Sequence, residues 1–305
     1  MDIKFVDILR CPATGGRLRL MAAEYYEGRR AVKKGVLRTE DGSHEYEIKN
    51  GVPRFVSRED YSSSFGYEWK KWSRVQFEDE NAGKPMQGHT KRMFDILSGM
   101  KPEDISGKLC VEFGCGPGRF LDMIRKYGGT AVGIDMSEAV EPARENFASD
   151  PDVLIIQGDI LKPPLAKGVF DFGYTFGVLH HTPDPPLGLR NLSALVKSGG
   201  RVSCCVYHKK GFYDYASVLI YRKFFNLLKP LLGIKPALFY SYFSANYLFH
   251  FLDIVKKIPK VRRIAYILEK YALVNLKIPD ANWRFLDIFD AVDRKSTRLN
   301  SSHIP

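Results

Sequence analysis

A glycine-rich segment with an acidic residue just ahead of it has the residue types and spacing that best fit a chemical site. Residues 111–120 read Val-Glu-Phe-Gly-Cys-Gly-Pro-Gly-Arg-Phe, an apolar run that continues into three alternating glycines. Glycine has no side chain, so Gly114, Gly116 and Gly118 permit a tight turn and let a ligand approach the backbone at the start of the next helix. The segment predicts a pocket for an adenosine-containing ligand.

The spacing of the turn separates two kinds of adenosine ligand. A dinucleotide-binding turn has the spacing G-x-G-x-x-G and holds a pyrophosphate at the N-terminus of the following helix. Here the spacing is G-x-G-x-G, and Glu112 lies two residues before the first glycine. A carboxylate at this position repels a phosphate and attracts an ammonium group. The pattern therefore favours an adenosine compound with a cationic amino-acid end.

Two further acids follow apolar segments downstream. Asp135 ends the run 130–135, 23 positions after Glu112, near the roughly 20-residue offset expected of a carboxylate that accepts from ribose hydroxyls. Asp159 follows the run 153–157 and can accept from an adenine exocyclic amine. Each has an alternative role, because Asp135 can cap a helix that begins at Ser137 and Asp159 can simply end a strand.

Four features follow one another along the sequence: the glycine turn, Asp135, Gly158-Asp159 and Val-Leu-His-His at 178–181. In the order of these features, the chain resembles the class I S-adenosylmethionine-dependent methyltransferases, in particular the small-molecule branch that includes ubiquinone and menaquinone methyltransferases. The resemblance covers about residues 88–206. Glu112 stands where Asp is more usual, and Ser198 where Pro is more usual. The resemblance implies S-adenosylmethionine as cofactor, bound by Glu112, Gly114, Cys115, Gly116, Gly118, Asp135, Met136, Asp159, Ile160 and Phe176.

The order of elements predicts the fold that this resemblance implies. An apolar strand that begins at Val111 and further apolar strands at 130–135, 153–157, 169–174 and 201–206 alternate with helical patterns, and the last helix is expected to end at Ser198-Gly199-Gly200. Such alternation gives a mainly parallel sheet, with the ligand at the carboxyl ends of its strands. We expect an α/β Rossmann-like methyltransferase sheet of at least five strands, with a small N-terminal β-rich module and a helical C-terminal insertion.

Methyl transfer needs few catalytic groups from the protein, because the sulfonium of the cofactor already activates the methyl group. Alignment of nucleophile, methyl and sulfur supplies up to roughly 7–11 kcal/mol, and a general base helps only where the acceptor must lose a proton. His181 is the candidate base, with His180, Tyr207 and His208 as other nearby groups. A structural or cofactor-side role is the alternative for His181.

The chain divides into five predicted segments. Residues 1–56 read as short strands broken by glycine turns, and their ends resemble the small ribbon domain related to the activator subunit of tRNA methyltransferases. Relatives of that domain hold zinc with four cysteines, whereas Cys11 stands alone here, so we expect no metal. The other segments are a linker and capping helix at 57–87 with aromatics Phe65, Trp69 and Trp72, the core at 88–206, a basic aromatic helical region at 207–290, and a disordered or artefactual tail at 291–305.

Almost all of the net charge of +11 lies in one region. Residues 208–278 contain 13 Lys or Arg and three acids, interleaved with bulky apolar runs. This composition suits peripheral contact with an anionic membrane, nucleic acid, or a helical lid with solvated lysines. Nucleic acid is disfavoured because no recognition motif is present. The uncharged run 236–252 is too short and too polar to span a membrane.

The remaining features concern compartment and chain ends. The five cysteines form no C-x-x-C pair and favour a reducing cytosol, and the N-terminus has no signal-peptide pattern. The polar, unpatterned residues 294–303 suggest a truncated chain without a sixth and seventh strand. The sequence predicts a cytoplasmic, membrane-peripheral methyltransferase acting on a small-molecule or lipid-linked acceptor. The alternatives are an RNA methyltransferase and a catalytically silent, cofactor-binding partner subunit.

Overall fold

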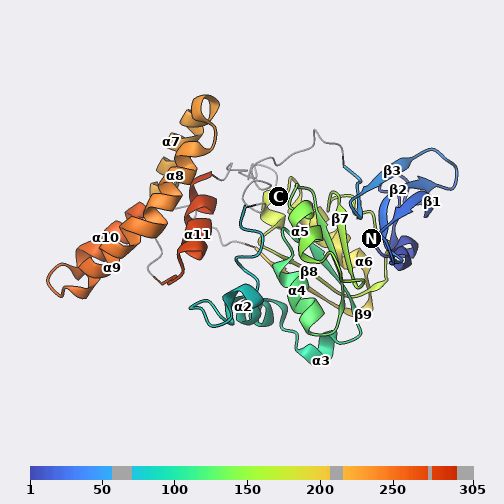
Figure 1. The fold of residues 1–305 in the computed structure, drawn as a ribbon, viewed down its shortest axis with the longest axis horizontal. Coiled ribbons are helices and arrows are strands. Elements are labelled where there is room, and N and C mark those ends of the chain that lie inside the picture. Colours follow the sequence, from blue (N-terminus) through green and yellow to red (C-terminus); the bar gives the residue numbers. More distant parts are fainter. Residues whose placement is uncertain (57–70, 207–215, 274–276, 294–305) are drawn as a thin grey trace. The chain divides into compact units, whose positions relative to one another are not determined.

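The computed structural model describes residues 1–56, 71–206, 216–273 and 277–293 (Figure 1). The chain forms two compact units. The first comprises Met1–Glu80 and Gly88–Val206, and the second Asn81–Gln87 and Tyr207–Pro305. The predicted linker, the capping aromatics Phe65 and Trp69, and residues 294–305 of the predicted tail lie outside the described residues.

The first unit contains a five-stranded parallel sheet. Its strands have the spatial order β7-β6-β5-β8-β9, and every neighbouring pair is parallel. The order reverses beside β5, which makes the carboxyl edge next to β5 the expected ligand crevice of such a sheet. The prediction of a mainly parallel, Rossmann-like sheet is confirmed. The strands are β5 (Leu109–Phe113), β6 (Thr130–Asp135), β7 (Val153–Gln157), β8 (Phe170–Phe176) and β9 (Val196–Cys205).

Both faces of this sheet are buried, as its continuous apolar strands require. Alternate residues of β5 enter opposite clusters: Val111 and Phe113 pack on one side and Cys110 on the other. Helices α4 and α5 contribute to the cluster with Cys110, and α6 to the cluster with Val111. The helices of this unit are α2 (His89–Ser98), α3 (Pro102–Ile105), α4 (Arg119–Lys126), α5 (Val140–Asn146) and α6 (Pro185–Leu195), with short turns η1 (Ile3–Ile8), η2 (Asp79–Asn81, reaching into the second unit) and η3 (Leu179–His181).

Strand β9 begins earlier than the sequence suggests. Helix α6 ends at Leu195, and Ser198–Gly200 belong to β9 instead of to the end of a helix. Val196 pairs with Phe170, and the register then shifts before Phe172 pairs with Arg201. Gly199 has a φ of 77° within this irregular stretch, which explains why a glycine pair that looks like a helix stop sits inside a strand.

Residues 1–56 form a four-stranded antiparallel sheet, which confirms the predicted β-rich N-terminal module. Its order is β1-β2-β3-β4, a simple meander. Cys11 is a buried thiol whose Sγ lies 3.1 Å from the hydroxyl of Tyr46. The strands are β1 (Leu18–Tyr25), β2 (Val32–Thr39), β3 (Glu45–Lys49) and β4 (Val52–Pro53).

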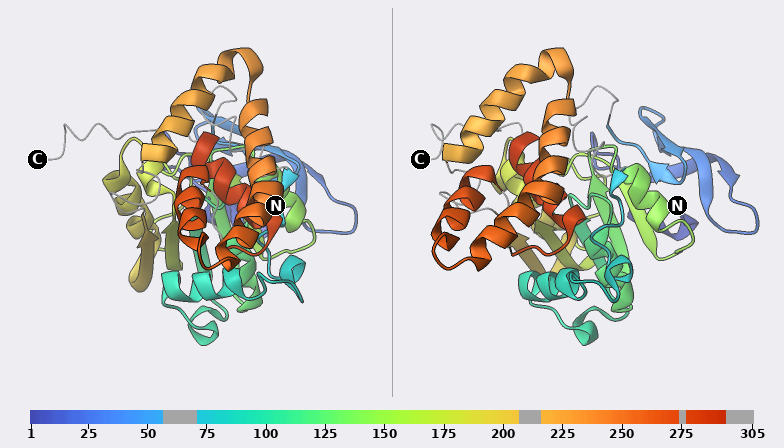
Figure 2. Two further views of the ribbon diagram at one scale, coloured as in Figure 1. Left: turned by 90° about the vertical axis from the view of Figure 1, so that its left-hand side faces the viewer. Right: turned by 60° about the vertical axis from the view of Figure 1, so that its left-hand side comes forward.

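This N-terminal sheet and the parallel sheet share one hydrophobic cluster. Phe5, Leu9 and Leu37 from residues 1–56 pack in the same cluster as Val111 and Leu154. Backbone contacts join the two at the β7 edge, where the amide of Phe55 donates to the carbonyl of Gln157 at 2.8 Å. Figure 2 shows the N-terminal strands beside this end of the parallel sheet. The module therefore covers an edge and part of a face that would otherwise be exposed.

The second unit is helical. Two buried arginines tie its helices together: Arg222 Nε donates to the carbonyl of Ala291 at 2.8 Å, and Arg284 Nε to the carbonyl of Ala245 at 2.9 Å. The predicted helical C-terminal region is confirmed, and its last helix continues to Asp293, into the segment expected to be a tail. The helices are α7 (Ala216–Leu232), α8 (Lys235–Phe243), the π turn η5 (Ser244–Leu248), α9 (Phe249–Lys257), α10 (Arg262–Ala272) and α11 (Ala281–Asp293).

Candidate functional site

The glycine loop lies between β5 and α4, at the carboxyl edge of the parallel sheet. Gly114, Gly116 and Gly118 have φ angles of 73°, 52° and 95°, in the left-handed region that favours glycine. Neighbouring side chains also leave no room for a β carbon at Gly114 or Gly118. A β carbon at Gly118 would lie 2.5 Å from Cε2 of Phe147, and one at Gly114 would collide with the side chain of Val178. The loop backbone thus approaches its neighbours as only glycine allows.

Asp135 ends β6 and is bonded to this loop. Its Oδ2 accepts from the amide of Gly116 at 2.9 Å, and its Oδ1 accepts from the amide and the hydroxyl of Ser137 at 2.8 and 2.6 Å. A carboxylate has about four acceptor positions, so these three bonds leave capacity for a ligand hydroxyl. Asp135 thus closes the turn at Ser137 and contacts the loop, whereas the helix expected to begin at Ser137 begins at Val140 with Ala139 as its N-cap.

Glu112 is a buried carboxyl group beneath the loop. The residue is 3% exposed, and the Tyr174 hydroxyl donates to its Oε2 at 3.2 Å. Burial raises the pKa of Glu112 well above its ordinary value. The Tyr174 hydrogen bond and the charge of Arg119 lower this pKa by less, and the charge of Asp135 raises it further. Burial therefore favours the neutral form of Glu112 in the free protein, and a cation at this place would favour the ionised form.

Asp159 and Ile160 follow β7 at the same edge. Oδ1 of Asp159 accepts from the amide of Leu161 at 2.8 Å, so this carboxylate closes the turn after the strand, as its structural alternative predicted. Asp159 is half-buried and Ile160 is buried in the cluster shared with the N-terminal sheet. The side chain of Ile160 is thus a core residue.

The other predicted cofactor residues meet the loop from different sides. Cys115 is buried, and burial raises the pKa of its thiol; a β carbon at Gly133 would lie 2.7 Å from its Sγ, so the side chain packs against β6. The carbonyl of Met136 accepts from Nε2 of Gln157 at 3.2 Å. At the end of β8, the ring of Phe176 contacts that of Phe120, the second residue of α4, edge-on at 5.4 Å.

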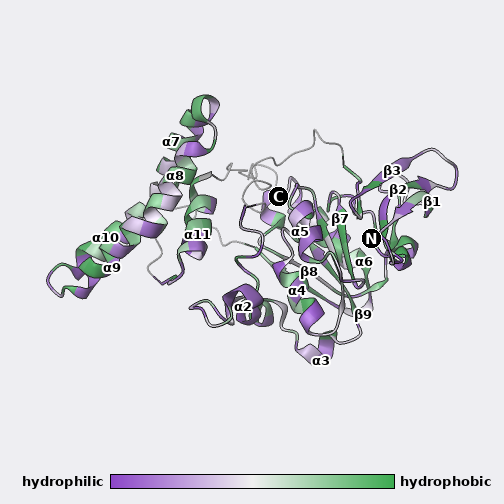
Figure 3. Cartoon of the chain, viewed as in Figure 1, coloured by the Kyte–Doolittle hydropathy of each residue, from purple (hydrophilic) through white to green (hydrophobic). Residues whose placement is uncertain are grey.

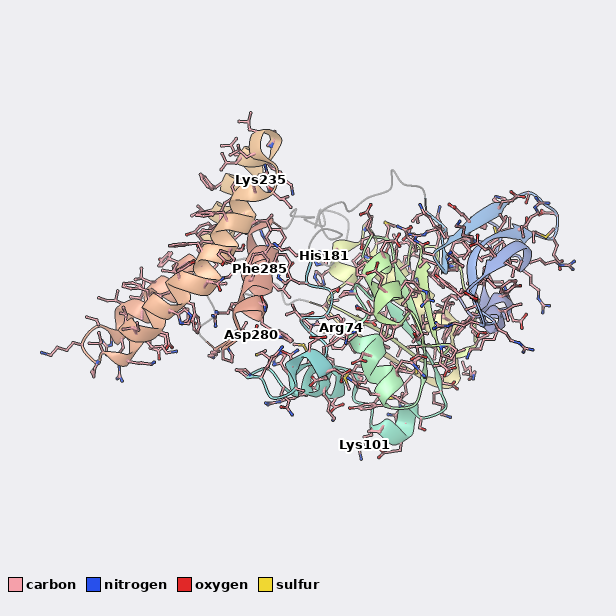
Figure 4. The ribbon with its side chains drawn as sticks, in the orientation of Figure 1. Arg74, Lys101, His181, Lys235, Asp280 and Phe285 are labelled. Atoms are coloured by element: carbon pink, nitrogen blue, oxygen red, sulfur yellow. The ribbon has the colours of Figure 1, made fainter. Side chains whose placement is uncertain are left out.

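His181 lies in η3, directly after β8 (Figure 4). Its ring centroid is 4.0 Å from that of His180, and its backbone amide donates to the carbonyl of Val178 at 2.9 Å. Both residues follow the carboxyl end of β8, which belongs to the edge that carries the glycine loop. Two other groups considered as bases, Tyr207 and His208, lie outside the described residues.

Two residues near the carboxyl edge of the sheet were not indicated by the sequence patterns. Tyr174 was seen only as part of an apolar strand, although its hydroxyl meets Glu112. Arg54 donates to Oε1 of Gln157 at 2.7 Å and to Oε1 of Glu141 at 2.6 Å, so the N-terminal segment reaches the residue that holds Met136. A tyrosine at an otherwise apolar strand position is a detectable signal for a buried partner, whereas nothing local distinguishes Arg54.

Within the described ranges of the chain, no group of three or more His, Cys, Asp or Glu side chains is arranged to hold a metal ion. In the same ranges, no helix has the length and apolar character needed to cross a bilayer.

Comparison with known proteins agrees with this geometry. Residues 111–204 match the family model described as a methyltransferase domain. The chain is 29% identical over 129 residues to the ubiquinone biosynthesis O-methyltransferase of Coxiella burnetii, covering 41% of this chain and 54% of that protein. It is 37% identical over 100 residues to an uncharacterized 37.1 kDa protein in transposon TN4556 of Streptomyces fradiae, covering 32% and 29%. The chain thus spans about half or less of the length of these relatives.

Among solved structures, the S-adenosylmethionine dependent methyltransferase of Mesorhizobium loti is similar to this chain. The two are 24% identical, with a TM-score of 0.37 over 42% of this chain and 58% of the other. The matched family residues coincide with β5 to β9, which carry the glycine loop and Asp135. Residues 111–204 of this chain, which carry the glycine loop and Asp135, are therefore similar to a methyltransferase domain.

Proposed function

We propose that the whole chain is an S-adenosylmethionine-dependent methyltransferase that acts on a small-molecule or lipid-linked acceptor. The observation that carries the proposal is the hydrogen bond from the amide of Gly116 to Asp135, because it fixes the glycine loop against a carboxylate at the carboxyl edge. Family relatives named as ubiquinone biosynthesis O-methyltransferases support a hydroxyl group as the acceptor class.

Each residue at the edge has a role suited to its chemistry. Asp135 accepts from the ribose hydroxyls, and Glu112 faces the ammonium of the methionine end, which offsets the cost of ionising a buried carboxyl group. Asp159 accepts from the adenine exocyclic amine, and Phe176 lies beside the adenine or sulfonium. The backbone of Gly114, Cys115, Gly116 and Gly118 forms the floor, with Met136 and the backbone of Ile160 beside the adenosine.

The bound cofactor supplies a methyl group activated by its sulfonium, and the protein contributes position. Transfer forms a bond from the acceptor oxygen to the methyl carbon and breaks the bond from that carbon to sulfur, leaving S-adenosylhomocysteine and one proton. His181, directly after β8, is the group we assign to take that proton from a hydroxyl acceptor. Orientation alone supplies the larger part of the acceleration.

The cysteines and the basic helical region bear on the compartment and on the acceptor. All five cysteines are thiols in the structure, which supports a reducing compartment, and we assign the protein to the cytosol. A lipid-linked acceptor requires contact with a membrane, and residues 208–278 are the segment we assign to peripheral contact. Residues 1–56 we assign as a metal-free module related to a ribbon domain.

Calorimetric titration with S-adenosylmethionine tests the cofactor site. Wild type should bind, whereas Asp135→Ala and Gly116→Arg should weaken binding strongly, because the first removes the loop anchor and the second fills the pocket floor. Asp7→Ala, at an exposed aspartate, is the matched control and should bind as wild type does. Equal binding by all four proteins would refute the site.

A turnover assay tests the reaction itself. Formation of S-adenosylhomocysteine would be followed with phenols and catechols, with and without an isoprenoid tail, and with bulk RNA as a separate acceptor. Product with a phenolic acceptor is the expected result. Product with RNA alone would support the RNA methyltransferase alternative, and cofactor binding without product from any acceptor would support the silent partner subunit.

A further inference from the structure

Helix α7 exposes an apolar stripe along its whole length. Spacings of four, three and four residues place its members on one side of the helix. The other side is buried, with Val218 fully covered and Phe225 nearly so. An amphipathic helix in solvent normally presents polar groups on its outer side, so this stripe needs a partner. Its members, 54–85% exposed, are Ile220, Phe224, Leu227 and Leu231.

A second stripe runs along the continuous helical segment α8, η5 and α9. Again the spacing is three or four residues, and the five side chains are 45–71% exposed. The rings of Phe239 and Phe243 stack with centroids 6.3 Å apart, and those of Phe243 and Tyr247 with centroids 5.7 Å apart. The members are Phe239, Phe243, Tyr247, Phe251 and Ile254.

Both stripes lie on the side away from α11. Arg222 of α7 and Ala245 of η5 mark the inner side, because each is hydrogen-bonded to a residue of α11. A position two residues along an α-helix is rotated by about 200°. Phe224 therefore points away from α11. In the second stripe, Phe243 and Tyr247 are exposed, whereas Ala245 between them is fully buried. We name the two stripes, together with the exposed Ile264, Ile267 and Tyr271 of α10, the exposed helical face. Figure 3 shows how hydrophobic residues run along these helices.

This face is accompanied by a large excess of positive charge. Residues 216–273 contain ten Lys or Arg and two acids, Asp253 and Glu269. Asp253 is already engaged by Lys256 and Lys257, at 2.6 and 3.0 Å. The turns between helices hold much of the charge; Lys235 is labelled at the first of them in Figure 4. The exposed basic side chains are Lys223, Lys235, Lys257, Lys260, Arg262 and Arg263.

We propose that the exposed helical face binds the surface of an anionic lipid bilayer, with its helices lying in the plane of the head groups. This inference rests on the proposed function, because a lipid-linked acceptor is reached from such a surface. Aromatic and aliphatic side chains beside Lys and Arg are the combination that interfacial helices use. The positive excess requires a negative partner, and aliphatic side chains such as Leu227 and Leu231 gain nothing from nucleic acid.

Flotation with lipid vesicles tests the proposal on the full chain without cofactor. The protein should float with phosphatidylglycerol-containing vesicles at low salt and far less with phosphatidylcholine alone. Raising the salt to 1 M shortens the Debye length from about 10 Å at 0.1 M to about 3 Å and should release most of the protein. Absence of flotation with anionic vesicles at low salt would overturn the proposal.

Surface variants separate the two contributions. Phe239→Ser with Phe251→Ser should lower the partition coefficient on the order of tenfold, because both rings leave apolar contact. Lys260→Glu with Arg263→Glu should lower it by more than tenfold, since each basic residue near an anionic surface contributes about fivefold. Ile96→Ser, at a 68% exposed position of α2 in the other unit, is the matched control and should float as wild type does.

Other occupants of the face give different outcomes. A dimer seen by light scattering that Phe239→Ser with Phe251→Ser converts to monomer, together with absent flotation, would assign the face to a second copy and overturn the proposal. Salt-sensitive RNA binding lost only in the charge variant would overturn it as well. Cofactor titration of the same variants should match wild type, so failure of the membrane contact and failure of the cofactor site are distinguishable.

Discussion

The buried carboxyl group of Glu112 predicts that cofactor binding releases a proton. In the free protein, burial raises the pKa of Glu112 well above the usual glutamate value, so the neutral acid persists where an exposed glutamate is ionised. An ammonium group beside it favours the carboxylate. Binding should therefore expel the proton, and affinity should rise with pH across the interval between the usual glutamate pKa and the raised one.

The magnitude follows from linkage. Release of one proton changes the binding free energy by about 1.4 kcal/mol per pH unit, which is tenfold in affinity. Glu112→Gln retains the shape and the contact with the Tyr174 hydroxyl but cannot ionise. Loss of a buried charge pair costs about 2–5 kcal/mol, so the variant should bind at least roughly 30-fold more weakly at the upper end of this pH interval. The difference should shrink as the pH falls.

The same reasoning gives the sign for stability without cofactor. A folded-state pKa above the unfolded one contributes stability that is complete below the unfolded pKa and is lost as pH rises through the folded pKa. Wild type should therefore lose stability with rising pH relative to Glu112→Gln, by up to about 1.4 kcal/mol per pH unit. The variant should be the more stable protein at neutral pH, although it binds cofactor worse.

Two measurements check this pair of effects. Titration calorimetry in two buffers of different ionisation enthalpy counts the protons released, which should be more for wild type than for Glu112→Gln. Urea unfolding of both free proteins over a pH series measures the stability difference. Equal proton release by the two proteins, or a stability difference that does not vary with pH, would refute the reasoning.

Three further substitutions test the packing around the site and in the helical unit. Gly114→Ala should abolish cofactor binding and lower the free energy of unfolding by more than the roughly 1–2 kcal/mol of left-handed strain, because its β carbon collides with Val178. Gly88→Ala is the control, since Gly88 has a φ of 77° with open space around it. Urea unfolding of this control should show the strain alone. Arg54→Met should weaken cofactor binding and lower the free energy of unfolding by about 1–3 kcal/mol. Arg19→Met removes an exposed ion pair with Glu40 and should change neither quantity. Calorimetry measures both effects. Arg284→Met should lower the unfolding temperature of the helical unit, because the carbonyls of Ala245 and Ile278 lose their donor; calorimetry should leave the first unit's transition unchanged.

The sheet and its glycine loop could be predicted because their signals are local. Strands β5, β6 and β7 are short apolar runs bounded by glycine or acid, and the loop is glycine where the backbone enters the left-handed region. Asp135 was foreseen at the loop for the same reason, since parallel strands bring their carboxyl ends to one edge. The start of β9 was not foreseen, because Ser198-Gly199-Gly200 has the local composition of a helix end and its pairing with β8 is not local.

Contacts between distant segments were the part that local patterns could not supply. Tyr174 and Glu112 are 62 positions apart, and Arg54 and Gln157 are 103 apart. Strand periodicity places Tyr174 on a buried face, but only the register of β8 against β5, in which Tyr174 pairs with Glu112, brings its hydroxyl to that carboxyl group. Such a pairing depends on the whole sheet, and no window of sequence encodes it.

The N-terminal sheet supports the turn that follows β6. Arg54 holds Gln157, and Gln157 donates to the carbonyl of Met136, the residue directly after Asp135. The chain of bonds thus runs from residues 1–56 to the turn that carries Asp135, the carboxylate we assign to the ribose. The same segment supplies Phe5 and Leu9 to the cluster beneath the sheet. Removing it would expose that cluster and the β7 edge while releasing the turn, so we expect cofactor affinity and folding to be lost together.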